Sequence, residues 1–235
     1  MKITLYLITL FSMTLLISCG GSGLDPMTNA RGEHATTLMA NGQLFVSGGR
    51  DAKPLTSTET LDPVNGSWTV GAPMLNKRYN HSQILMGNGN LLVVGGGVRD
   101  LTPEIYNTSA GSWSETQKMK YPRRQGHAST LMSDGRILVT GGIAEVNGNK
   151  KAVPHAEIFD PSNETWSDAS DMLNPRERHE AILLDNNKIL VVGSNTDDFQ
   201  GEIIKSQSWP IILSLIHISE PTRRTPISYA VFCLK

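Results

Sequence analysis

The chain has 235 residues, a formal net charge of -1 and 39% hydrophobic residues, which is the composition of an ordinary globular protein. This charge argues against nucleic acid as a partner, because phosphate binding depends on clustered Lys and Arg. The 22 glycines and 6% aromatic residues favour short strands and tight turns over a helical bundle. The two cysteines, Cys19 and Cys233, lie near opposite ends and give no support for a disulfide framework.

Residues 1–19 are typical of a secretory signal, with Lys2 followed by an apolar run over residues 3–17. The run ends in Leu-Ile-Ser-Cys, which resembles the lipobox of bacterial lipoproteins. That resemblance implies cleavage before Cys19, a diacylglycerol on its thiol and a durable membrane anchor. Gly20 in the second mature position implies the outer membrane, and residues 20–26 form a flexible tether. An ordinary signal peptide or a short membrane anchor is the alternative.

Four phased copies of one motif follow the tether, about 50 residues apart. Each begins with a methionine and an Arg-x-x-His, continues with an alternating apolar stretch, a polar turn and a second apolar strand, and three copies then show a glycine pair. In the third copy we assign this arginine to Arg124, with one extra residue after the methionine. The pairs are Arg31 and His34, Arg78 and His81, Arg124 and His127, and Arg176 and His179; the glycines are Gly48 and Gly49, Gly95 and Gly96, and Gly141 and Gly142.

A variable loop, a third strand and a turn that leads to a tryptophan complete the first three copies. The third strands are expected at residues 58–62, 103–107 and 156–160, and the tryptophans are Trp68, Trp113 and Trp166. The third copy has a polar insert at residues 147–151. The fourth copy is weaker: it reads Gly193-Ser194 in place of the glycine pair, its third strand falls near residues 201–204, and Trp209 is loosely spaced.

These motifs resemble the kelch repeat over residues 27–212, and four short strands per period describe one propeller blade. The resemblance implies an all-β, partial kelch-type β-propeller of about four blades of four-stranded antiparallel sheets, similar to the central domain of galactose oxidase. Closed kelch rings have six or seven blades, so we expect the two end blades to expose apolar faces. The blades are expected at residues 27–73, 74–118, 119–171 and 172–212.

The repeated residues have structural explanations. Glycine pairs permit positive φ and close approach to the next blade, while each tryptophan fills the wedge between sheets. Four of the six histidines hold one repeat position, spread one per blade rather than converging on a point. We therefore expect the Arg-x-x-His motifs to orient the first strands, and we expect no metal and no cofactor.

Residues 213–223 resemble the translation of a transposase-end sequencing adapter. We therefore expect residues 213–235 to be an artefactual tail behind a truncated gene; a genuine C-terminal tail is the alternative. Cys233 and His217 then have no function.

Enzymatic activity is not expected from these residues. Oxidases resembling galactose oxidase need a tyrosine cross-linked to a cysteine inside the ring, and the cysteines of this chain are Cys19 and Cys233. No paired carboxylates or nucleophile–base set stands out. A periplasmic kelch enzyme acting on sugars, epimerase-like or oxidase-like, and a purely structural envelope protein remain the alternatives.

Binding is the expected use of such a ring. In kelch domains that capture peptides, contacts come from the loop after the glycine pair and from the position two beyond the arginine. We expect a protein or glycan ligand at the bacterial cell envelope. The candidate positions carry charges of both signs, so they indicate neither an acidic nor a basic ligand. Carried over to this chain, the positions are Arg50, Asp51, Arg99, Asp100 and Glu145, with Glu33, Asn80 and Arg178; the third copy has Gly126 at the second position.

Overall fold

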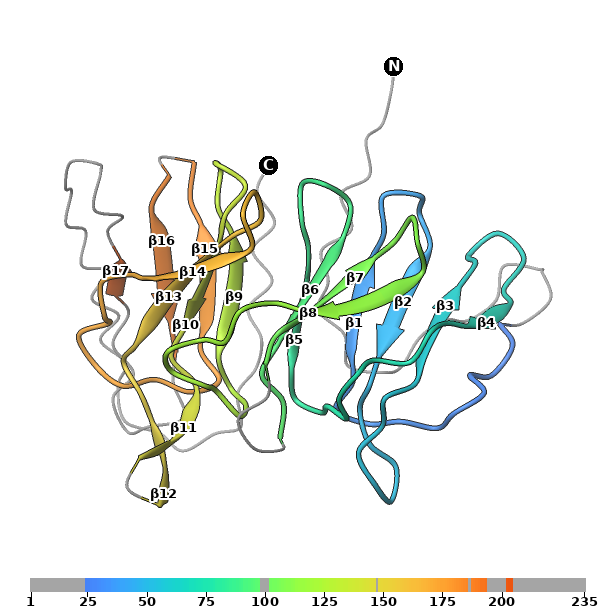
Figure 1. Ribbon diagram of the computed structural model, residues 1–235, viewed down its shortest axis with the longest axis horizontal. Coiled ribbons are helices and arrows are strands. Elements are labelled where there is room, and N and C mark those ends of the chain that lie inside the picture. The colour runs from blue at the N-terminus through green and yellow to red at the C-terminus, as the bar shows by residue number, and fades with distance from the viewer. Residues whose placement is uncertain (1–23, 98–101, 147, 186, 194–201, 205–235) are drawn as a thin grey trace, which may run out of the picture. The chain divides into compact units, whose positions relative to one another are not determined.

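The computed structural model describes residues 24–97, 102–146, 148–185, 187–193 and 202–204. The predicted signal with Cys19, the loop residues Arg99 and Asp100, and the tail with Cys233 lie outside them. Every regular element within the described residues is a β-strand (Figure 1). The chain divides into two compact units, residues 1–115 and 116–235, and each is described by itself.

The first unit holds two four-stranded antiparallel sheets whose strands pair in chain order. In both sheets the second strand lies inside and a glutamate on the third strand faces a valine of the second, as in the pairs Val46 with Glu59 and Val93 with Glu104. The strands are β1 (Ala35–Leu38), β2 (Leu44–Ser47), β3 (Thr58–Leu61) and β4 (Trp68–Val70), then β5 (Ser82–Leu85), β6 (Leu91–Val94), β7 (Glu104–Asn107) and β8 (Ser112–Glu115).

The second unit repeats this pattern with a third four-stranded sheet and a three-stranded one. In the fourth sheet, Glu202 pairs with Val191 in the register that the other three copies use, so the weak fourth repeat does have its third strand. The strands are β9 (Ala128–Leu131), β10 (Ile137–Thr140), β13 (Ala156–Asp160) and β14 (Thr165–Asp168), then β15 (Glu180–Leu183), β16 (Ile189–Val192) and β17 (Glu202–Ile204).

The polar insert of the third copy is longer and more regular than the sequence interpretation allowed. It is a β-hairpin of β11 (Ile143–Val146) and β12 (Asn149–Ala152) between β10 and β13, and it projects from the end of that sheet in Figure 1. Asn-Gly at residues 147–148, with Gly148 at φ +77°, is the dipeptide that two-residue hairpin turns favour. That dipeptide was the signal available in the sequence for a hairpin.

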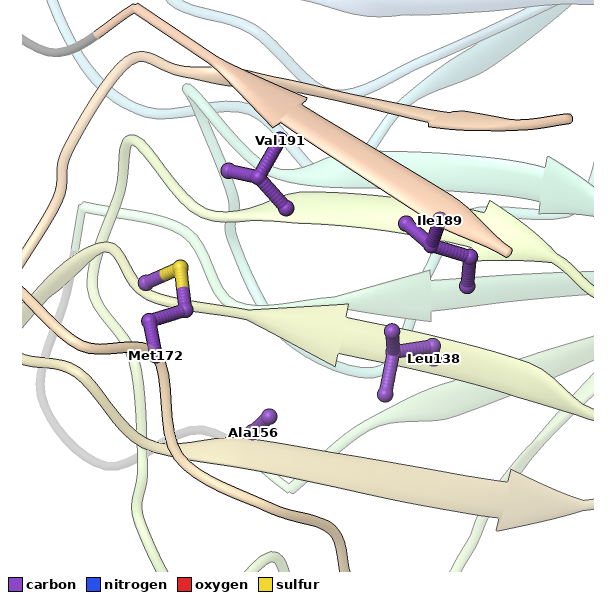
Figure 2. Close-up of a cluster of buried hydrophobic side chains, with 5 residues drawn as sticks. All are labelled: Leu138, Ala156, Met172, Ile189 and Val191. Carbon is purple, nitrogen blue, oxygen red and sulfur yellow. The ribbon is translucent and has the colours of Figure 1, made fainter. Parts of the chain in front are cut away.

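The apolar second strands form the core of each unit. All four residues of β6 and of β10 are buried, whereas β1 and β15 alternate between half-buried and exposed residues. Figure 2 shows how neighbouring sheets share this core: Leu138 of β10 and Ala156 of β13 lie in one cluster with Met172 and with Ile189 and Val191 of β16. Burying such side chains contributes about 1.5–3 kcal/mol each, so each sheet depends on its neighbour for much of its stability.

Candidate functional site

Each of the first three sheets contains a buried arginine–glutamate pair. The carboxylates of Glu59, Glu104 and Glu157 are at most 1% exposed and lie 2.5–2.8 Å from the guanidinium groups of Arg31, Arg78 and Arg123. Two backbone N–H groups just after each repeat methionine also donate to the carboxylate, for example those of Leu75 and Asn76 to Glu104 at 2.8 and 3.0 Å. Removal of one partner from such a pair would leave an uncompensated buried charge.

Burial and these hydrogen bonds shift the pKa of Glu59, Arg78 and Arg123. Burial alone would raise the pKa of Glu59, but the hydrogen bonds from Thr28, Arg31 and Asn29 together bring that pKa below its ordinary value. Burial lowers the pKa of the Arg78 and Arg123 guanidinium groups, while their glutamate partners oppose that shift. The buried arginine–glutamate pairs therefore have a structural role within the sheets.

The arginine of the third copy is Arg123, which corrects the assignment of this role to Arg124. Arg123 stands four residues after Met119, the spacing of the other copies, and the extra residue falls between the arginine and His127. Its guanidinium donates to the carbonyl oxygens of Gly141 and His155, both at 2.9 Å, as Arg31 does to Gly48 and Ser57 at 2.8 Å. In the fourth copy Arg176 donates to the Gly193 carbonyl at 2.9 Å.

Two of the repeat histidines join neighbouring sheets. His81 Nε2 lies 2.8 Å from the Ser47 hydroxyl at the end of β2, and His179 Nε2 lies 2.8 Å from the Thr140 hydroxyl at the end of β10. Burial, with a smaller effect of Arg176, lowers the pKa of His179 to about 4. His34, in the first copy, is exposed, and His127 is half-buried against Gly142.

The glycine pairs allow the sheets to approach each other. Gly48 and Gly141 have φ of +54° and +55°, and a Cβ on either would lie 2.5 Å from the carbonyl oxygen of Arg78 or Arg176 in the next copy. Gly49, Gly95, Gly96 and Gly142 also have positive φ. The backbone N–H of Gly49 and of Gly142 donates to those same two arginine carbonyls at 2.8 and 2.7 Å.

The tryptophans pack against the same interfaces. Trp113 donates its indole N–H to the Ala72 carbonyl at 2.9 Å, and its ring centroid lies 6.3 Å from that of Phe45 in the neighbouring sheet. Trp166 donates to the Thr116 hydroxyl at 3.3 Å rather than to a carbonyl. Trp68 is half-buried and pairs with Leu61 across the sheet.

The structure brings three of the ligand-binding candidates together in the first unit. Glu33 Oε1 lies 2.9 Å from Arg50 Nη2, and Glu33 Oε2 accepts a hydrogen bond from Asn80 Nδ2 at 3.0 Å. Tyr79, which the sequence interpretation missed, lies beneath the Arg50 guanidinium at 5.3 Å from ring centroid to Cζ. Tyr79 directly precedes Asn80, which is a predicted candidate, and this adjacency was the signal that could have identified it. Asp51 is exposed beside this cluster.

The candidates of the second unit lie differently. Glu145 is on β11 and pairs with Arg124, and Arg178 is exposed with its backbone N–H bonded to the Gly126 carbonyl at 2.7 Å. His155 stacks on Tyr121 with ring centroids 3.8 Å apart, and its Nδ1 lies 3.0 Å from Asp171.

Two other kinds of feature are absent from the described residues. Within residues 24–204, gaps aside, no three or more His, Cys, Asp or Glu side chains gather in a way that could hold a metal ion. Across the same part of the chain, no helix has the length and apolar character that a membrane crossing requires.

Comparison with known proteins gives one family. Residues 32–75 and 126–173, in the first and third copies, match the model of the Kelch motif. No curated protein matches the chain. Kelch repeats are typical of propeller modules that bind proteins or act as scaffolds, and the sheets described above have the strand order and antiparallel pairing of their blades. The chain therefore has an all-β fold, that of a partial kelch-type β-propeller.

Proposed function

We propose that this chain is a membrane-anchored binding or scaffold module that recognises a protein or glycan at the bacterial cell envelope. The kelch motifs support the binding role. The lipobox-like Leu-Ile-Ser-Cys, with Cys19 as the lipidated residue and residues 20–26 as the tether, supports anchoring. Gly20 after the cysteine favours the outer membrane.

The binding role rests on one observation: some polar residues of the repeats are buried and hold the sheets, whereas others lie at the surface. Arg31, Arg78 and Arg123 are buried in ion pairs that hold the sheets, whereas Glu33, Arg50 and Asn80 form a partly exposed polar cluster at the sheet ends. Exposed ion pairs of this kind contribute only about 0–1 kcal/mol to stability. The cluster is therefore available to a ligand.

Binding is tested with the full chain on a glycan array and on immobilised envelope proteins. The variant Glu33→Ala/Arg50→Ala/Asn80→Ala should lose most of the signal. A matched control is Asp134→Ala/Arg136→Ala, which removes another exposed ion pair, 2.6 Å long, from the turn between β9 and β10. Equal binding by the triple variant and the control would refute a role for this cluster.

Anchoring is tested by labelling with a radioactive fatty acid in a bacterial host. The wild-type chain and Cys233→Ala should incorporate the label and sediment with outer membranes, whereas Cys19→Ala should do neither. Incorporation by Cys19→Ala would disprove lipidation at that residue. Recovery of the labelled wild type in the inner membrane would disprove the outer-membrane location.

A further inference from the structure

We propose, building on the anchoring proposed above, that the turn between β3 and β4 contacts the lipid bilayer to which Cys19 tethers the chain. The contact would be made by three apolar side chains, those of Leu24, Val64 and Val70, at the headgroup boundary. This part of the first sheet would then have phospholipid, and not a protein, as its partner.

The tether ends beside this turn. The backbone N–H of Asp25 donates to the Gly66 carbonyl at 3.0 Å, which holds Asp25 against the β3–β4 turn. Leu24, the residue before it, is 48% exposed. Five peptide units join Cys19 to Leu24, so their two Cα atoms lie at most about 18 Å apart. A lipid on Cys19 therefore keeps this turn close to the bilayer surface.

The turn carries an apolar residue where the other copies carry a polar one. Val64 stands two residues after Asp62, and its counterparts in the second and third copies are the exposed Ser109 and Ser162. The backbone N–H of each donates to the side-chain oxygen of the residue two before it, at 2.8–3.1 Å, so the three turns share one geometry. A single exposed valine is common, but Val64 is 94% exposed at a position where the same turn accepts serine.

The edge strand of the same sheet lacks the charge that its counterparts carry. Val70, at the end of β4, is 58% exposed, and the residues at its position in the next two copies are Glu115 and Asp168. Among the described strands, β4 pairs with β3 alone, so it forms the outer edge of its sheet. Carboxylates are costly at the apolar boundary of a bilayer, whereas valine is accepted there. Both departures from the repeat therefore favour contact with lipid.

A few apolar side chains suffice because the anchor supplies most of the affinity. Once the lipid on Cys19 is inserted, contact between the turn and the bilayer is an intramolecular step, so weak interactions are enough to populate it. The acidic residues of this region, Asp25 and Asp62, offer no attraction to anionic headgroups. We therefore expect the contact to form on zwitterionic phosphatidylcholine.

The test places a fluorophore on the turn and measures its quenching by the bilayer. The full lipidated chain, in a Cys233→Ala background, carries a nitrobenzoxadiazole label on Val64→Cys or, as the matched control in the same unit, on Ser109→Cys. The chains are bound to phosphatidylcholine vesicles with or without nitroxide-labelled acyl chains. We expect at least about twofold stronger quenching at residue 64 than at residue 109, because the turn beside the anchor enters the headgroup boundary. Adding Val70→Glu should reduce the quenching at residue 64 by about half or more, because it restores a carboxylate to the sheet edge.

Equal quenching at residues 64 and 109, or none at residue 64, would overturn the contact, and unchanged quenching at residue 64 in Val70→Glu would do the same. Shielding of residue 64 from aqueous iodide that needs an envelope protein extract, without nitroxide quenching, would assign this surface to a protein partner instead. A chain that incorporates no fatty acid refutes the anchoring itself. A lipidated, vesicle-bound chain without quenching at residue 64 leaves the anchoring intact and refutes this contact alone.

Discussion

The two units share one buried framework and differ in the loops it carries. In both, a glutamate of the third strand pairs with an arginine that also holds a glycine carbonyl, and a histidine joins neighbouring sheets through a hydroxyl. At the sheet ends, Glu33 of the first unit contacts Arg50 and Asn80, whereas the second unit has Gly126 beside Arg178.

This difference between the units distinguishes the buried residues that stabilise each sheet from the loop residues that could contact a ligand. The backbone hydrogen bond from Asn80 to Glu33 recurs as the bond from Arg178 to Gly126, so the loop geometry is the same with or without a carboxylate. Substitutions in the buried framework should therefore destabilise both units to a similar extent. Ligand binding should depend on the loop residues of the first unit.

Removal of the buried glutamate should have the largest effect, and an equal one in both units. Glu104→Ala leaves Arg78 as an unpaired buried charge, and Glu157→Ala does the same to Arg123. We expect each to lower the free energy of unfolding by about 3–5 kcal/mol, measured by urea denaturation. A loss below 1 kcal/mol in either unit would show that the framework is not shared.

Substitution of the first glycine of a pair comes next. Gly48→Ala and Gly141→Ala would each place a Cβ 2.5 Å from a carbonyl oxygen at positive φ, so we expect losses of about 2–4 kcal/mol. Gly42→Ala is the matched control, because Gly42 also has positive φ, +84°, but nothing lies within 4 Å of a Cβ there. It should lose about 1 kcal/mol. Similar losses at Gly42 and Gly48 would argue against the contact between sheets.

Acid should destabilise the second unit through His179. Its pKa is about 4 in the folded chain against an ordinary value of 6.5, so the unfolded chain binds the proton first. Stability should therefore fall by about 3 kcal/mol as the pH drops from about 6.5 to about 4. Thermal melts across this range should show a flatter pH dependence in His179→Gln. An identical pH profile in that variant would contradict the assignment.

The smallest expected effect is a gain. Arg178→Gly relieves a residue at φ +54° and should raise the free energy of unfolding by about 0.5–1 kcal/mol. Glu33→Gly should gain less, because it also breaks the contacts with Arg50 and Asn80. Calorimetry of the two variants compares them directly, and a larger gain for Glu33→Gly would reverse the proposed contrast.

The sequence predicted the strands well because their signals are local. Alternating and continuous apolar stretches, bounded by Asn-Gly or Asp-Gly turns, located β1, β2, β5, β6, β9 and β10, and spacing alone located β17. The errors came from contacts between distant residues. Arg124 was chosen over Arg123 because the spacing to His127 favours Arg124 while the spacing from Met119 favours Arg123, and the contact with Glu157 decides between them. The convergence of Glu33, Arg50 and Asn80 likewise depends on the packing of two sheets.

The hairpin β11–β12 indicates where this fold accepts foreign sequence. The Val153 N–H bonds to the Gly142 carbonyl at 3.0 Å and closes the base of residues 143–152, just as the Leu55 N–H bonds to Gly49 at 2.9 Å around residues 50–54. Doubling such a loop costs only about 0.6 kcal/mol in closure entropy. Peptides grafted between Gly49 and Leu55 should therefore be displayed without disturbing the strands behind them, which makes this chain a scaffold for engineered display.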